Sequence, residues 1–268
     1  MLPGATWLIA AALVAPVAVA GLSTGAAADD AVVDPSVSPS ESPSVSPSPV
    51  ESIPVTPTPT IAPELAMETQ LSALGIPTGV VDGIVSPGTK RGMCVFRDLT
   101  GQKATRKLPT PELMQQISTT TELPQLPRKL RSVKALVSLT CQAAYITDGT
   151  GTILRVLSVS TGKDNGVHRT RPGFKRVYYK VNAWQRSTLY PEPDGRPGLY
   201  RPIYFDRGIA FHGVRKPVRT YPQSHACVRT WPADQDWLWN KLKVRDRVFV
   251  YGDYWRGHSA SLGGYGKV

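Results

Sequence analysis

The chain has 268 residues, 41% of them hydrophobic, which is enough for an ordinary globular core and excludes a wholly disordered chain. Its net charge of +11 is unevenly divided: residues 126–268 carry 25 basic and 9 acidic side chains, whereas residues 1–125 carry 6 and 11. The C-terminal half should therefore be drawn to a polyanion. Charge alone does not separate nucleic acid, anionic lipid and a cell wall rich in carboxylate and phosphate.

The N-terminus contains an apolar run of sixteen residues, from Trp7 to Leu22, which is shorter than the roughly 20 residues that span a bilayer. Small-x-small sites end at Ala20 and Ala28, so residues 1–28 are predicted to be a secretory signal peptide. No Lys or Arg precedes Trp7, which leaves an uncleaved membrane anchor or a misplaced start codon as alternatives. Export places the protein outside the cytoplasmic membrane, secreted or in the cell wall, and favours wall anions over nucleic acid as its partner.

Residues 29–63 are predicted to be a disordered linker. Nine of the 25 prolines lie between Pro35 and Pro63, among Ser, Thr and Val. Such a segment cannot bury enough apolar surface to fold and should be extended, at about 3 Å per residue or some 90 Å over residues 34–63.

A helical region follows. Leucines from Leu65 to Leu74 have helical spacing and are followed by Gly75, a typical helix stop. A second helix is expected after Thr89 and a third from Pro111, with Pro111 in the first turn. The second helix should turn three side chains inward: Met93, Cys94 and Phe96.

Several residues of this region resemble the three-helix peptidoglycan-binding domain found beside many wall enzymes: Leu71 to Gly75, Val81-Asp82-Gly83, Thr89 and Phe96. The resemblance covers about residues 64–117 and implies a domain that holds peptidoglycan. That family usually has Gly-Pro before the threonine, where this chain has Ser86-Pro87-Gly88. A helical spacer that binds no glycan is the alternative.

After an inter-domain linker at residues 118–130, the pattern becomes strand-like. Polar and apolar residues alternate from Ser132 to Leu139, and residues 142–146 and 153–159 flank a hairpin turn at 148–151. Further strands are expected at residues 176–179, 203–205, 209–211 and 248–251. One helix, from Ala233 to Leu242, is predicted in this mostly β region.

The candidate active site lies in two short motifs, Phe211-His212-Gly213 and Ser224-His225-Ala226-Cys227-Val228-Arg229. A cysteine is nucleophilic as thiolate, and a nearby imidazole and a fixed positive charge lower its pKa. His212 lies fifteen positions before Cys227, which suits the ends of two elements joined by a loop.

Four segments, in order, resemble the L,D-transpeptidase catalytic domain: Ser160-Thr161-Gly162, Thr170-Arg171-Pro172-Gly173-Phe174 and the two motifs above. The resemblance spans residues 131–252 and leaves 253–268 as a flexible tail. It implies an α+β multidomain protein, in which a small three-helix domain precedes a mostly β catalytic domain with one main helix.

The resemblance also implies the roles of the motif residues. Cys227 matches the nucleophile, which attacks the carbonyl before the terminal D-alanine of a peptidoglycan stem tetrapeptide, releases D-alanine and forms a thioester. His212 matches the general base, its ring held by the carbonyl of Gly213. The main-chain N–H groups of Ala226 and Cys227 would form the oxyanion hole. Arg229 would orient the substrate or hold the loop.

Other residues would shape the pocket. Ser224 and His225 would form the turn and line the pocket, and the turn-rich run from Tyr190 to Tyr200 occupies the position of a lid. Tyr200 or Tyr204 would then close upon the substrate, although an ordinary surface loop is the alternative.

Ala226 departs from the family, which usually has glycine at this position. If the position requires φ > 0, an L-alanine costs roughly 1 kcal/mol and shifts the oxyanion donors. Reduced activity, or a protein without activity, is therefore an alternative.

The chain has three cysteines. With Cys227 as the free thiol, an exported protein would pair Cys94 with Cys141 and staple the helical domain to the first strands. Two separate buried thiols are the alternative.

No metal site or cofactor is predicted, because no histidine or cysteine has the spacing of a metal ligand. The expected partner is a diaminopimelate-containing stem peptide, joined to a second stem in a 3-3 cross-link, and a carbapenem is an expected inhibitor. An L,D-carboxypeptidase, with water as acceptor, is an alternative in the same class. A non-catalytic wall-binding protein has no use for a thiol between a histidine and an arginine, and a papain-like amidase would place its cysteine before its histidine.

Overall fold

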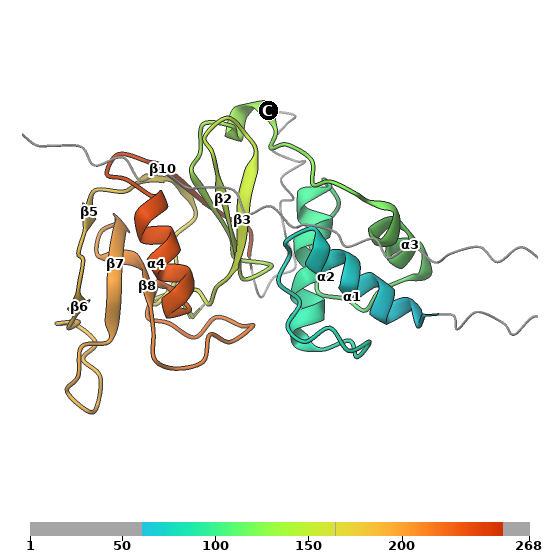
Figure 1. The fold of residues 1–268 in the computed structure, drawn as a ribbon. Helices are drawn as coiled ribbons and strands as arrows, with labels where there is room; N and C mark the ends of the chain where they lie inside the picture. The colour runs from blue at the N-terminus through green and yellow to red at the C-terminus, as the bar shows by residue number, and fades with distance from the viewer. Residues whose placement is uncertain (1–60, 164, 254–268) are drawn as a thin grey trace, which may run out of the picture. The chain divides into compact units, whose positions relative to one another are not determined.

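The computed structural model describes residues 61–163 and 165–253, which belong to one compact unit, residues 57–268. Three helices are followed by two β-sheets and a fourth helix (Figure 1). The predicted signal peptide, nearly all of the predicted linker and the tail after Asp253 lie outside the described residues. Within the described ranges, no helix is long and apolar enough to cross a membrane.

Each helix of the first region begins with proline, whose missing N–H is not needed in the first turn. The helices are α1 (Pro63–Ala73), α2 (Pro87–Leu99) and α3 (Pro111–Thr119). A capping box starts α2: Ser86 Oγ accepts a hydrogen bond from Thr89 N at 3.1 Å, and Thr89 Oγ1 accepts one from Ser86 N at 3.0 Å. At Gly88 an added Cβ would lie 2.2 Å from Thr78 O, so a larger residue at this position would require the backbone to move.

Two sheets form the rest of the fold. The first has the order β3 (Ile153–Ser158), β2 (Ala143–Thr147), β1 (Ala135–Ser138), β10 (Arg247–Tyr251) and β4 (Gly173–Arg176). The second has the order β5 (Tyr179–Lys180), β7 (Leu199–Asp206), β8 (Ile209–Gly213) and β9 (Val228–Thr230), with β6 (Trp184–Gln185) beside β7. A 3-10 turn, η1 (Arg128–Leu130), precedes β1, and α4 (Pro232–Lys241) packs against β7 and β8.

The central strands of the first sheet, β1, β2 and β10, are buried on both faces. Ala135 and Val137 belong to a core shared with the second sheet, whereas Leu136 belongs to a core shared with the helices. Successive side chains of a strand point to opposite faces, so β1 supplies both cores. Polar and apolar residues alternate from Ser132 to Leu139, yet all four residues of β1 are buried. The strand predicted at 176–179 is wrong, because β4 ends at Arg176 and β5 begins at Tyr179 in the other sheet.

The three helices and the first sheet share one core. Met67, Phe96 and Ile117 lie in the same buried cluster as Tyr145 and Phe249. The linker predicted at residues 118–130 therefore does not separate two cores. Three short helices bury little surface by themselves, and the sheet face supplies what they lack.

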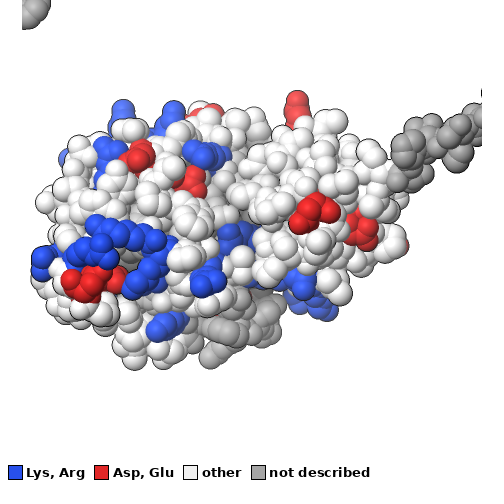
Figure 2. Space-filling view, turned by 60° about the horizontal axis from the view of Figure 1, so that its bottom comes forward, with Lys and Arg blue, Asp and Glu red and all other residues white. Residues whose placement is uncertain are grey.

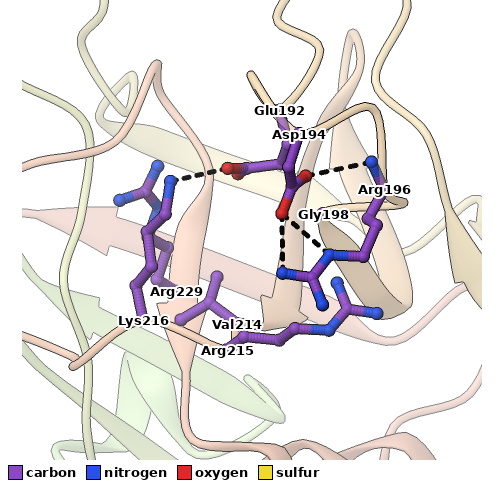
Figure 3. Close-up of a pocket in the computed structure, with 8 residues that line it drawn as sticks. All are labelled: Glu192, Asp194, Arg196, Gly198, Val214, Arg215, Lys216 and Arg229. Atoms are coloured by element: carbon purple, nitrogen blue, oxygen red, sulfur yellow. Dashed lines mark hydrogen bonds and ion pairs between the residues drawn. The ribbon is translucent and has the colours of Figure 1, made fainter.

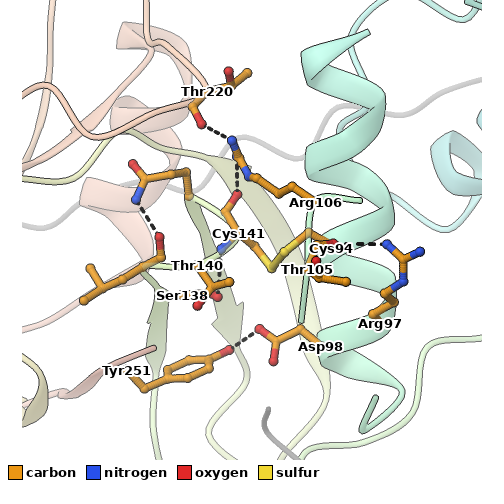
Figure 4. Close-up of a disulfide and its surroundings, with 12 residues drawn as sticks. Cys94, Arg97, Asp98, Thr105, Arg106, Ser138, Thr140, Cys141, Thr220 and Tyr251 are labelled. Atoms are coloured by element: carbon orange, nitrogen blue, oxygen red, sulfur yellow. Dashed lines mark hydrogen bonds between the residues drawn. A yellow bond between two sulfur atoms is a disulfide. The ribbon is translucent and has the colours of Figure 1, made fainter. Parts of the chain in front are cut away.

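Covalent and polar contacts reinforce this shared core (Figure 4). Cys94 of α2 and Cys141 form a disulfide with a Cα–Cα distance of 5.4 Å. The carboxylate of Asp98 accepts hydrogen bonds from the hydroxyls of Tyr145 at 2.8 Å and Tyr251 at 2.6 Å. The second helix is thus joined to three segments of the β region.

Candidate active site

The adjacent strands β8 and β9 set the faces of the candidate catalytic residues. The two strands are parallel, with Phe211 opposite Val228 and His212 opposite Arg229. Phe211 and Val228 are fully buried in the core between the sheets. Because side chains alternate, His212 and Arg229 lie on the other face, and so does Cys227, two positions before Arg229.

This face borders a cavity of about 590 Å³. Seven of the predicted site residues line it: Tyr204, His212, Ser224, His225, Ala226, Cys227 and Arg229. Residues 185–193 and Tyr204 line it from the other side. Two predicted site residues, Gly213 and Tyr200, are not among the lining residues.

Ser224 ties the turn before Cys227 together. Its hydroxyl donates a hydrogen bond to the carbonyl oxygen of Cys227 at 2.5 Å and accepts one from the N–H of Ala226 at 3.1 Å. Ala226 has φ +99°, a conformation that favours glycine. The N–H of Ala226, which the resemblance assigns to the oxyanion hole, donates to Ser224 Oγ in this structure, so its part in an oxyanion hole stays a prediction.

Three residues outside this turn, Thr161, Gly162 and Thr170, contact it. Ser224 N donates to Thr161 O at 3.0 Å, and Thr170 Oγ1 donates to Ala226 O at 2.6 Å. An added Cβ at Gly162 would lie 2.6 Å from the Cα of Ala226. The motifs Ser160–Gly162 and Thr170–Phe174 therefore support the turn directly. They provide its hydrogen-bond partners, and Gly162 leaves room for the backbone of the turn.

His212 is buried, with 3% of its surface exposed, and a hydrogen bond to the main chain fixes the orientation of its ring. Nδ1 lies 3.1 Å from the carbonyl oxygen of Gly213. A carbonyl only accepts hydrogen bonds, so Nδ1 carries the proton and Nε2 has a free lone pair. Burial lowers the pKa of His212 to about 4, so the ring is neutral at neutral pH and serves as a base.

Cys227 is partly exposed at the cavity. Burial raises the pKa of its thiol, while the N–H of Ala210 and the charge of Arg229 act in the opposite direction. A raised thiol pKa and a lowered imidazole pKa leave both groups neutral at pH 7. The chemistry then requires proton removal during attack rather than a preformed thiolate–imidazolium pair.

Residues 132–250 match the L,D-transpeptidase catalytic domain. This match supports an enzyme of the L,D-transpeptidase class. No curated protein sequence matches the chain.

Solved structures resemble parts of the chain. An L,D-transpeptidase fragment from Xylanimonas cellulosilytica DSM 15894 has 26% identity and a TM-score of 0.49, over 70% of this chain and 92% of that one. An L,D-transpeptidase from Stackebrandtia nassauensis has 23% identity and a TM-score of 0.43, over 71% and 91%. L,D-transpeptidase 3 from Mycobacterium tuberculosis, in complex with a faropenem-derived adduct, has 18% identity and a TM-score of 0.40, over 44% and 60%.

The two tyrosines that were expected to close upon a substrate both lie in β7 but differ in position. Tyr204 lines the cavity and donates a hydrogen bond to Gln185 Oε1 at 2.9 Å. Burial, with the charge of Cys227 as a second cause, raises the pKa of Tyr204 to about 12, so its hydroxyl stays protonated. Tyr200 instead donates to Asp236 of α4 at 2.8 Å. Only Tyr204 is placed to meet a ligand in the cavity.

A cluster of aromatic rings joins the turn before Cys227 to Tyr190. No pattern in the sequence predicts this cluster. The ring of Tyr190 stacks on His225, with 4.1 Å between centroids, and His168 lies edge-on at 4.8 Å from His225. Nothing in the local sequence relates His168 to His225, because the chain must fold before they meet.

Among residues 61–163 and 165–253, no three His, Cys, Asp or Glu residues are grouped to hold a metal ion.

Proposed function

We propose that the chain is an exported L,D-transpeptidase whose nucleophile is Cys227 and whose general base is His212. One observation carries the assignment. The parallel pairing of β8 with β9 brings His212 and Cys227 to one face and one cavity, with His212 Nε2 available as acceptor.

Acylation would proceed as follows. His212 Nε2 takes the thiol proton as Cys227 Sγ attacks the carbonyl that precedes the terminal D-alanine of a stem tetrapeptide. The C–N bond breaks, the D-alanine amine leaves with a proton, and a thioester remains. The N–H of Cys227 is the oxyanion donor in this proposal, since the N–H of Ala226 donates to Ser224.

Deacylation would complete the transfer. An amine of a second stem attacks the thioester, the C–S bond breaks, and the product is a 3-3 cross-link at diaminopimelate. Thioesters react readily with amines, which suits an exchange between two amines. The same thiol would open the ring of a carbapenem and form a stable adduct.

Surface charge supports a wall polymer as substrate. Figure 2 shows Lys and Arg gathered on the β part of the molecule, and residues 126–268 carry a large excess of basic side chains. Peptidoglycan stems carry carboxylates, which such a surface attracts. The export of the chain and glycan binding by the helical region are parts of the same proposal.

The test uses the purified full chain and its Cys227→Ala variant, incubated with disaccharide-tetrapeptides and separately with a carbapenem. Mass spectrometry should find cross-linked dimers, released D-alanine and a carbapenem adduct on Cys227, all absent from the variant. D-Alanine release without dimers would assign an L,D-carboxypeptidase. The absence of products and adduct from the folded wild-type protein would overturn the proposal and favour a wall-binding protein.

A further inference from the structure

A smaller pocket of about 130 Å³ adjoins the active-site cavity (Figure 3). Eight residues line it: Glu192, Asp194, Arg196, Gly198, Val214, Arg215, Lys216 and Arg229. Four of them also line the larger cavity: Glu192, Gly198, Lys216 and Arg229. The pocket is therefore a side chamber of the space that contains Cys227.

The two walls of this chamber have opposite charge patterns. The wall formed by residues 214–216 and Arg229 contributes three cations and no acid. Both acids come from the lid segment, residues 192–198. Asp194 is neutralised within that segment, since it forms an ion pair with Arg196 at 2.7 Å. Glu192 is the acid that reaches across to the basic wall.

Glu192 forms an ion pair with Lys216 at 2.6 Å. Gly198 leaves space for this side chain, because an added Cβ there would lie 2.8 Å from Glu192 Cγ. The pair is partly exposed, with 62% of the Lys216 side chain and 27% of the Glu192 side chain accessible. Such pairs contribute little to stability, so another carboxylate can replace Glu192 at small cost.

Arg229 is another of the three cations of the basic wall and lies two positions after Cys227. Its Nε is buried and has no hydrogen-bond partner among the residues that the structure describes. Burial lowers the pKa of Arg229, and the charge of Glu192 is the largest influence in the opposite direction. The guanidinium thus has donor capacity to spare beside the nucleophile.

We propose that Lys216 and Arg229 form a carboxylate-binding subsite beside Cys227, and that Glu192 of the lid occupies it until a substrate carboxylate displaces it. The identification of that carboxylate with a stem peptide rests on the proposed function. The subsite itself rests on the charges and contacts of the chamber. Glu192 then competes with the substrate, and opening of the lid leaves the basic wall without an acid.

The first test measures alkylation of Cys227 in the oxidised full chain by iodoacetate, an anion, and by iodoacetamide, its neutral analogue. With Cys94 and Cys141 paired, Cys227 is the free thiol. The rate constant for iodoacetate divided by that for iodoacetamide is a ratio in which changes in thiol reactivity cancel. It should rise about threefold or more in Glu192→Gln and fall by a similar factor in Lys216→Gln.

Lys129→Gln is the matched control, because it removes one exposed positive charge far along the sequence from the chamber. Its ratio should equal that of the wild-type protein. Equal ratios in all four proteins would overturn the subsite, and so would an equal fall in Lys129→Gln and Lys216→Gln, which would indicate a general charge effect.

The second test separates the subsite from the proposed reaction. Lys216→Gln should raise KM for a stem tetrapeptide with little change in kcat, and Glu192→Gln should lower KM. Tetrapeptides amidated at either the C-terminal alanine or the diaminopimelate side chain identify the bound carboxylate, since amidation of that group should abolish both effects. Shifted alkylation ratios without turnover of any stem would retain the subsite and reject the proposed function. Turnover of stems with unchanged alkylation ratios and unchanged KM would retain the proposed function and reject the subsite.

Discussion

The guanidinium group of Arg106 donates a hydrogen bond to the carbonyl oxygen of Thr220, 114 positions further along the chain (Figure 4). A second hydrogen bond, of 2.9 Å, joins Arg106 to the carbonyl oxygen of Cys141. Arg91 of α2 donates similarly to Arg219 O at 2.9 Å. The helical region therefore holds the loop that leads into the catalytic turn at Ser224.

Arg106→Gln should lower the activity of the enzyme while the fold is retained. The loss of charged hydrogen bonds to Thr220 and Cys141 should reduce the free energy of unfolding by about 2 kcal/mol, and the loosened loop should reduce kcat by roughly tenfold. Chemical denaturation and steady-state kinetics measure the two effects. Lys107→Gln, one position away and exposed, should change neither. A wild-type kcat in Arg106→Gln would show that the loop needs no such support.

Gly162→Ala should disrupt the catalytic turn. The added methyl would lie 2.1 Å from His168 O and 2.6 Å from the Cα of Ala226, so the backbone must move. We expect a loss of about 3 kcal/mol in the free energy of unfolding and a slower acylation of Cys227. Gly166→Ala serves as control: its φ is +82° and no atom lies within 4 Å, so it should cost only about 1 kcal/mol of backbone strain. Equal effects of the two substitutions would contradict the close packing of Gly162 on the turn.

His212 should make the stability of the protein depend on pH. Its folded-state pKa of about 4 lies below the ordinary 6.5, so between these values the unfolded chain binds a proton that the folded chain does not. The free energy of unfolding should therefore fall by about 3 kcal/mol as the pH is lowered from 6.5 to 4. Urea denaturation at several pH values should show this slope in the wild-type protein and a flatter one in His212→Gln. The acid limb of kcat/KM should lie near pH 4, since catalysis needs the neutral ring; an acid limb near pH 6.5 would argue against the buried neutral ring.

Removal of the Cys94–Cys141 disulfide should destabilise the whole described unit. The bond closes a loop with a sequence separation of 47, for which chain entropy predicts about 4 kcal/mol. The Cys94→Ser/Cys141→Ser double variant and the reduced wild-type protein should unfold at the same lower denaturant concentration in a single transition. Two separate transitions would show that the helices and the sheets unfold independently, contrary to their shared core.

Part of the site could be predicted from the sequence. The order and spacing of the motifs around His212 and Cys227 identify a thiol and a base, and strand periodicity places Arg229 on the face of Cys227. The cysteine count and the choice of Cys227 as the free thiol lead to the pair that the structure joins. Such inferences depend on residue type and on local periodicity, which the chain carries without folding.

Other features could not be predicted, because they depend on partners distant in the sequence. The N–H of Ala226 was expected to face an oxyanion, yet Ser224 Oγ accepts its hydrogen bond. Tyr200 and Tyr204 are four positions apart on one strand, but the register of β7 shifts between Tyr200 and Ile203, and one hydroxyl meets Asp236 whereas the other tyrosine lines the cavity.

The sequence by itself determined which chemical groups the protein has: three cysteines, a histidine fifteen positions before the last of them, and an excess of basic side chains in the C-terminal half. The tertiary structure decided how they are used. It placed the three helices on the sheet, set Arg106 against the loop before Ser224 and brought Glu192 to Lys216. Residue identity sets what a group can donate or accept, whereas only the folded backbone sets what lies within the roughly 3 Å over which hydrogen bonds form.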